Sequence, residues 1–135
     1  MVVNIVNKRE VHEEIQKINN YLAKCLWMDF EFAQINYNNI VAAGRIDTSY
    51  NDFAINIDFG MPFYMSTLLS WHLDDSKPFI ELVTGEEERD FIEKYQVELG
   101  NYIFKINAED FDTAPIFIAS HRIKCELVNE HPFGK

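Results

Sequence analysis

The strongest constraint on the fold is the segment from Phe53 to Phe59. Its odd-numbered positions are all large and apolar, whereas its even-numbered positions hold Ala, Asn and Asp. A period of two predicts a β-strand with one buried face and one face in water. This strand therefore predicts an antiparallel sheet with an exposed polar surface.

Two preceding segments are expected to pair with this strand. The apolar face of Asp29–Tyr37 switches between Phe32 and Ala33, which predicts a β-bulge. Asn38-Asn39 suits a tight hairpin, because Asn tolerates positive φ. Ile40–Asp47 is the next strand, and the three segments together predict an antiparallel meander.

A helix is expected from Lys8 to Lys24. Asn7 and Glu10 have the spacing of an Asn-led capping box. The apolar residues recur at steps of three and four, which is typical of one helix face. That stripe, expected to cover the apolar face of the sheet, is Val11, Ile15, Ile18, Leu22 and Cys25.

The second half of the chain predicts further strands and one more helix. Gly60-Met61-Pro62 is expected to interrupt the sheet, and the alternation over Phe63–Leu73 favours a fourth strand over a helix that starts near Pro62. Thr84 to Glu87 has the pattern of a capping box. The remaining expected elements are a strand over Phe79–Val83, a helix over Gly85–Tyr95, a strand over Asn101–Asn107, an acidic loop over Ala108–Pro115, either two strands over Ile116–Ser120 and Ile123–Val128 or one long bent strand over both, and a fraying tail over Asn129–Lys135.

These elements predict a single α+β domain over residues 1–135. Its mostly antiparallel sheet would carry the long N-terminal helix on one face, with a second, shorter helix over about 85–95. Cys25 and Cys125 lack metal or redox spacing and are expected to be buried, reduced thiols. The chain has neither the pattern of a signal peptide nor an apolar run that could span a membrane, so a cytoplasmic location is expected.

Negative charge is concentrated in the middle of the chain. The net charge is −10, and residues 29–112 carry all of the surplus, because both ends are slightly basic. Such a surface disfavours direct binding to nucleic acid and to anionic membranes, and it attracts a cationic partner. Solubility alone is the alternative explanation.

Three acidic clusters are the predicted partner-binding residues. Each cluster lies in an expected turn, at a helix start or in a loop, where exposed side chains can meet another protein. The clusters comprise Asp74 and Asp75; Glu86, Glu87, Glu88 and Asp90; and Glu109, Asp110 and Asp112.

A rival hypothesis is a small-molecule or enzymatic pocket between the sheet and the N-terminal helix. An ordinary hairpin register would set Asp58 beside Arg45 and Asp47, with Trp71 and His72 near the edge of this surface. Cross-strand charge pairing is the simpler explanation of the same residues and is favoured. The choice between the two hypotheses depends on whether these side chains converge.

No catalytic, cofactor or metal motif is present in the sequence. The four histidines lack further ligands at metal-binding spacing, and there is no phosphate-binding glycine loop or nucleophile elbow. Catalytic residues, cofactors and metals are therefore predicted to be absent.

In its size, acidity and lack of catalytic residues, the chain resembles the small bacterial immunity proteins that neutralise a cognate toxin. This resemblance implies a non-catalytic inhibitor that masks the basic active site of a toxin, such as a nuclease domain. It implies a basic protein as the partner and transfers no individual functional residue. A subunit that forms a homodimer through its sheet edge is a third possibility.

Overall fold

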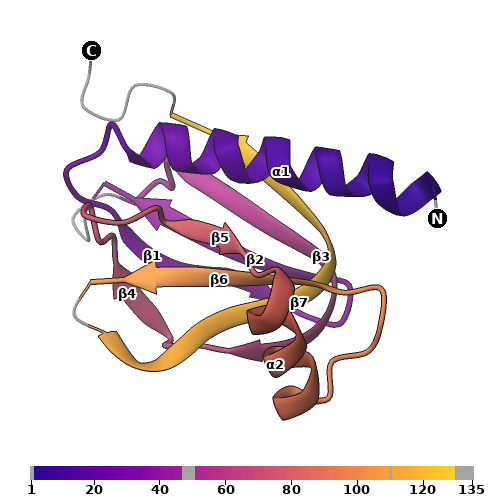
Figure 1. Cartoon of the computed structure of the whole chain (residues 1–135). Coiled ribbons are helices and arrows are strands. Elements are labelled where there is room, and N and C mark those ends of the chain that lie inside the picture. Colours follow the sequence, from indigo (N-terminus) through magenta and orange to yellow (C-terminus); the bar gives the residue numbers. More distant parts are fainter. Residues whose placement is uncertain (1, 47–50, 110, 130–135) are drawn as a thin grey trace.

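The computed structural model describes residues 2–46, 51–109 and 111–129, which form two helices and one antiparallel sheet of seven strands (Figure 1). The α+β class and the long N-terminal helix are therefore confirmed. The strand order is β4-β1-β2-β3-β7-β6-β5. In chain order the elements are α1 (Val2–Leu22), β1 (Asp29–Ile35), β2 (Asn39–Arg45), β3 (Ile55–Ser66), β4 (Ser70–His72), β5 (Ile80–Leu82), α2 (Gly85–Tyr95), β6 (Tyr102–Ala108) and β7 (Phe111–Leu127).

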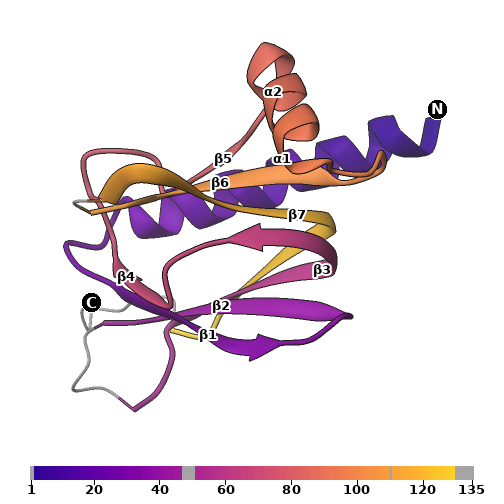
Figure 2. The same ribbon diagram turned by 90° about the horizontal axis from the view of Figure 1, so that it is seen from below.

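The sheet curls strongly, so strands that are far apart in the strand order come together (Figure 2). Leu73, directly after β4, forms an isolated antiparallel bridge with Ala108 at the end of β6. The backbone N–H of Glu109 donates to the carbonyl of His72 at 3.0 Å. The curl encloses the main hydrophobic core, to which α1 and all seven strands contribute residues.

The apolar stripe of α1 is buried in this core, as predicted. The helix itself begins at Val2 rather than Lys8 and ends at Leu22 rather than Lys24. Asn7 therefore lies inside the helix, and the predicted capping box is wrong. A capping pattern marks a helix start only when no helical turn precedes it. Here residues 2–6 form a helical turn before Asn7.

Side chains of α1 also cover the free edges of two strands. The Glu14 carboxylate accepts from the backbone N–H of Cys125 at 2.7 Å, and Lys17 Nζ donates to the Cys125 carbonyl at 2.9 Å. The Asn19 amide bonds the carbonyl and the N–H of Ile80, at 2.9 and 3.1 Å. These hydrogen bonds satisfy backbone N–H and carbonyl groups of β7 and β5 that have no neighbouring strand on the side facing α1.

A second, smaller apolar cluster lies on the outer face of β6 and β7, beneath α2. Phe91 of α2 packs edge-on against Phe117 of β7, with 4.7 Å between the ring centroids. The bounds of α2 agree with the prediction, but Thr84 makes no side-chain capping bond, so the predicted capping box is wrong here too. The acidic first turn still complements the helix dipole.

The predicted β-bulge in β1 is confirmed by a register shift between Phe32 and Gln34. Beyond the bulge, however, Ala33, Ile35 and Tyr37 are exposed rather than turned into the core. In this part of the sheet β1 pairs only with the start of β2. No second layer covers these side chains.

The hairpin between β1 and β2 is held by a side chain and needs no positive φ. Oδ1 of Asn36 accepts from the backbone N–H groups of Asn38 and Asn39, both at 2.9 Å. Neither Asn38 nor Asn39 has a positive φ, which corrects the expected role of these residues. An Asx turn supplies the reversal instead.

Gly60-Met61-Pro62 does not interrupt the sheet, which corrects the prediction. β3 continues to Ser66, with Met61 at φ 53° and a register shift between Pro62 and Tyr64. Residues 63–66 therefore end β3, and residues 70–72 form the short β4. The prediction that residues 63–73 form a strand rather than a helix is correct, but the segment is divided between two strands.

β7 is one long strand, which confirms the alternative of a single bent strand over Ile116–Val128, and it also includes most of the expected acidic loop. It starts at Phe111, so only Glu109 and Asp110 separate it from β6, and the predicted loop over Ala108–Pro115 is wrong. The hairpin accommodates Pro115, whose carbonyl accepts from Ser66 Oγ at 3.2 Å. Most of the predicted turn over 48–52 and of the tail over 129–135 lies outside the described residues.

Candidate functional site

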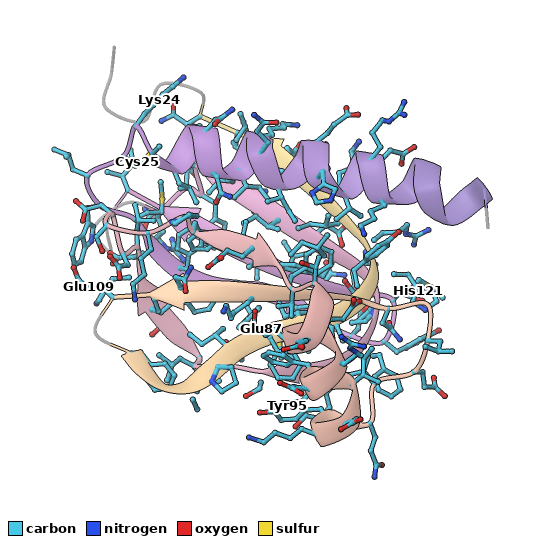
Figure 3. All side chains as sticks on the ribbon, in the orientation of Figure 1. Lys24, Cys25, Glu87, Tyr95, Glu109 and His121 are labelled. Carbon is cyan, nitrogen blue, oxygen red and sulfur yellow. The ribbon has the colours of Figure 1, made fainter. Side chains whose placement is uncertain are left out.

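The nine predicted partner-binding carboxylates do not form a single group. Asp74, Asp75 and Glu109 lie at the end of the molecule where the β4–β5 turn meets the tip of the β6–β7 hairpin, whereas Glu87 lies on α2 (Figure 3). Asp110 lies outside the described residues, and nothing is described of the Asp112 side chain. The acidic clusters therefore form two separate surfaces.

Backbone bonds assemble the first of these surfaces from three distant segments. The N–H of Leu73 donates to the carbonyl of Met28 at 2.9 Å, which joins β4 to the segment after α1. The bridge between Leu73 and Ala108 then joins it to the β6–β7 hairpin. Curling of the sheet is thus the direct cause of the convergence of residues 26–29, 72–75 and 109.

Trp27 is the large aromatic residue of this surface. Its ring packs at a tilt of 32° against the ring of His72, with 4.7 Å between the centroids, and its exposed fraction is 37%. Nδ1 of His72 pairs with Oδ1 of Asp29 at 2.5 Å, which fixes the imidazole beneath the indole. Leu26 is 78% exposed beside them. A large aromatic ring is therefore held in one orientation at the surface.

Asp74 is held by its own turn. Its Oδ1 accepts from the side chain and the backbone of Ser76, at 2.6 and 3.0 Å. These hydrogen bonds lower the pKa of Asp74, mainly through the Ser76 hydroxyl. The carboxylate consequently stays ionised and points in a defined direction, while Asp75 next to it is exposed.

We name this surface the loop-end patch. It consists of an apolar centre with a carboxylate rim, and Lys24 and Lys77 are the nearby basic residues of the same segments. Its members are Leu26, Trp27, Asp29, His72, Asp74, Asp75 and Glu109.

The acidic residues of α2 are a weaker candidate. Glu87 already pairs with Lys105 of β6, at 2.9 Å between the carboxylate and the ammonium. Arg89 and Lys94 alternate with the acidic residues along the helix. Acidic side chains at a helix N-terminus also have a structural explanation in the helix dipole.

The four residues of the rival pocket do not converge. Trp71 is buried in the core and stacks on Phe30 at 5.6 Å, because neighbouring residues of β4 point to opposite faces. Asp58 lies opposite Val41 rather than beside Arg45. The predicted neighbour Asp47 lies outside the described residues.

Arg45 and His72 nonetheless lie on one face of the sheet. The register places Asp29 opposite both of them, on β2 and β4 respectively. Arg45 pairs with Glu31 at 2.8 Å and lies over the ring of Phe53, 4.3 Å from its centroid. These contacts are the cross-strand pairing that was considered as the simpler explanation.

A groove does lie between α1 and the outer face of β3 and β7. Its volume is about 540 Å³, and of the four rival residues only Asp58 lines it, together with residues such as Glu10, Glu14 and Lys124. Asp58 is engaged there by Asn39, whose Nδ2 donates to it at 2.7 Å. The groove has mixed charge and brings no nucleophile beside a base.

Within the described part of the chain, no group of three or more His, Cys, Asp or Glu side chains could hold a metal ion. In that same part, no helix combines the length and apolar character needed to cross a membrane. Comparisons with protein-family models, curated protein sequences and solved structures find no match.

Sequence reasoning missed Leu26 and Trp27. They follow the end of α1 and lie between two buried residues, Cys25 and Met28. Two large apolar residues in a short connection were a usable signal, since such residues are normally covered. The hydrophobic pattern alone would have placed them in the core.

Proposed function

We propose that this protein is a non-catalytic binding module that docks a basic protein on the loop-end patch. The observation that carries the proposal is the contact of Trp27 with His72, whose imidazole pairs with Asp29, on segments that backbone contacts join to those carrying Asp74, Asp75 and Glu109. Preorganised aromatic side chains dominate many protein interfaces, because they bury a large area at low entropic cost.

The carboxylate rim suits a cationic partner. Charged groups around an apolar centre steer the encounter and select the partner, and they contribute less to the final affinity. Asp74 is fixed by its turn, so it pays little ordering entropy on binding. The partner surface that fits this patch presents an apolar pocket ringed by Lys and Arg.

The finer form of the proposal is an immunity-type inhibitor that covers the basic active site of a nuclease-like toxin in a bacterial cytoplasm. The small domain and its excess of negative charge support it, since active sites that bind phosphate backbones are basic. The same excess disfavours direct nucleic-acid or membrane binding by this chain.

The proposal is tested with the protein encoded beside the gene for this chain, using its C-terminal domain as the probe. We expect a tight complex by isothermal titration calorimetry, with an association rate that falls steeply between about 50 and 300 mM NaCl because screening shortens the reach of the charges. Trp27→Ala should weaken the complex by roughly 30-fold or more, as hot-spot truncations do.

Two matched variants control this experiment. Tyr37→Ala removes a more exposed aromatic ring on the β1–β2 hairpin, away from the patch. Asp90→Asn compares an α2 carboxylate with the Asp75→Asn change in the patch. Affinity should fall with Asp75→Asn and hold with both controls. Loss of affinity only with Asp90→Asn would move the site to α2, and the absence of any complex would contradict the immunity role.

A further inference from the structure

A second pocket lies at the opposite end of the molecule from the loop-end patch, where β7 bends (Figure 3). It has a volume of about 540 Å³ and lies between the N-terminal half of α1, the α2–β6 connection and the bend. We name it the bend pocket, and its polar lining is Lys8, Glu88, Asn101, Tyr102, His121 and Arg122.

The bend in β7 places two neighbouring residues on the surface together. Ile118 and Ile123 both face the core, so the inward-facing positions change from even to odd between them. His121 and Arg122 fall within this change and are both exposed. A regular strand would have turned one of the two toward the core.

Gly60 leaves room for the Arg122 side chain. A Cβ atom at position 60 would lie 2.9 Å from Nε and 3.2 Å from Nη2 of Arg122. The guanidinium therefore lies directly over the backbone of β3. A larger residue at position 60 would therefore displace the guanidinium from this position.

The cationic groups of the bend pocket are available to a ligand. None of Lys8, His121 and Arg122 forms an ion pair with another described residue. This is unexpected in a chain with a net charge of −10, where carboxylates greatly outnumber basic groups. Glu88 is the one carboxylate in the lining, which leaves the pocket with net positive charge.

We propose that the bend pocket binds the phosphate group of inorganic phosphate or of a small phosphate monoester. Arg presents a planar fork of donors that matches phosphate oxygens, and Lys adds a compact positive charge. Glu88 on the rim opposes long polyanions, so a nucleic-acid backbone does not fit. The site is independent of the loop-end patch and of the proposed partner.

The test measures binding of inorganic phosphate and of glycerol phosphate at constant ionic strength, with NaCl as the reference salt. Both calorimetry and the thermal midpoint of unfolding serve as readouts, because a ligand that binds only the folded state raises the midpoint. Arg122→Gln should weaken binding about tenfold or more, since it removes charge-assisted hydrogen bonds. Lys8→Gln should also weaken binding, and it serves if Arg122→Gln fails to fold.

Lys124→Gln is the matched control. It removes the same charge two positions along β7. Lys124 lines the groove beside α1, which Arg122 also lines, but it does not line the bend pocket. Binding that survives in Lys124→Gln and is lost in Arg122→Gln supports the site, and tighter binding of glycerol phosphate identifies an ester as the ligand. An equal response in all variants, or no response in the native chain, would overturn the proposal.

Discussion

Two glycines occupy strand positions where a neighbouring side chain leaves no room for a Cβ atom. At Gly44 on β2, that atom would lie 2.8 Å from Cε1 of Phe30 and 2.9 Å from Cγ of Met28. At Gly60 on β3, the two nearest atoms are Nε and Nη2 of Arg122, in the flexible end of an exposed side chain. Because Phe30 and Met28 are fully buried, the first contact cannot relax easily.

This difference predicts unequal effects of the same substitution. Gly44→Ala should lower the free energy of unfolding by about 1–3 kcal/mol through overpacking. Gly60→Ala should cost less, because Arg122 can move into water, but it should weaken phosphate binding in the bend pocket. Urea unfolding and calorimetry on both variants check this, and equal losses of stability would contradict the assignment of strain to the Phe30 contact.

The two tryptophans lie in contrasting environments. Trp71, expected near the edge of the polar surface, is buried, whereas Trp27, for which no prediction was made from the sequence, is exposed. In a short edge strand, alternation shows that Trp71 and His72 face opposite ways but not which of them faces inward. That choice depends on β1, where Phe30 stacks on Trp71.

At the scale of elements, α1 acts as a cover for sheet edges as well as a layer of the core. Its buried stripe was readable from the sequence, since a 3.6-residue period predicts one apolar face. Its polar contacts with Ile80 and Cys125 were not, because they join residues far apart in the chain. Covered edges also protect the sheet from pairing with other chains.

The Asn19 amide provides a direct test of this role. Asn19→Ala leaves the N–H and carbonyl of Ile80 without these partners and should lower the free energy of unfolding by about 1–3 kcal/mol. Asn20→Ala, at the next and exposed position, is the control and should change stability little. Hydrogen exchange at the Ile80 amide should accelerate only in Asn19→Ala; unchanged exchange there would contradict the edge-cover role.

At the scale of the whole molecule, two buried thiols and one buried phenol make the stability of the fold depend on pH in the alkaline range. Burial raises the pKa of the Cys25 and Cys125 thiols from 9.0 to about 11 each. Burial, together with the neighbouring thiols, raises the pKa of Tyr21 from 10.0 to about 12. The folded chain thus resists ionisation of all three groups, as expected for the reduced, buried thiols predicted from the sequence.

This linkage predicts the sign of the pH dependence. Below about pH 9 both states hold these protons, so the stabilisation is complete. As pH rises toward 11 the unfolded chain loses its protons first, and the free energy of unfolding should fall by at most a few kcal/mol. A Cys25→Ala, Cys125→Ala double variant should show a shallower decline in urea unfolding, whereas an identical slope would exclude the thiols as its cause.

The charges of the molecule are segregated in space, and the sequence showed this only in part. It located the acidic surplus between residues 29 and 112 but not its division between α2 and the loop-end patch. The bend pocket was not visible in the sequence at all. Lys8 and Arg122 come from opposite ends of the chain and meet only after folding.

The sequence by itself determined the class of fold, both helices and the pairing of the meander, because local periodicity encodes which face of each element is buried. Strand boundaries such as the continuation of β3 through Pro62 were decided by long-range pairing with β7. The surfaces were decided by the curl of the sheet, which brings Trp27, His72 and Glu109 together. Contacts between distant segments depend on the whole fold, and no local pattern records them.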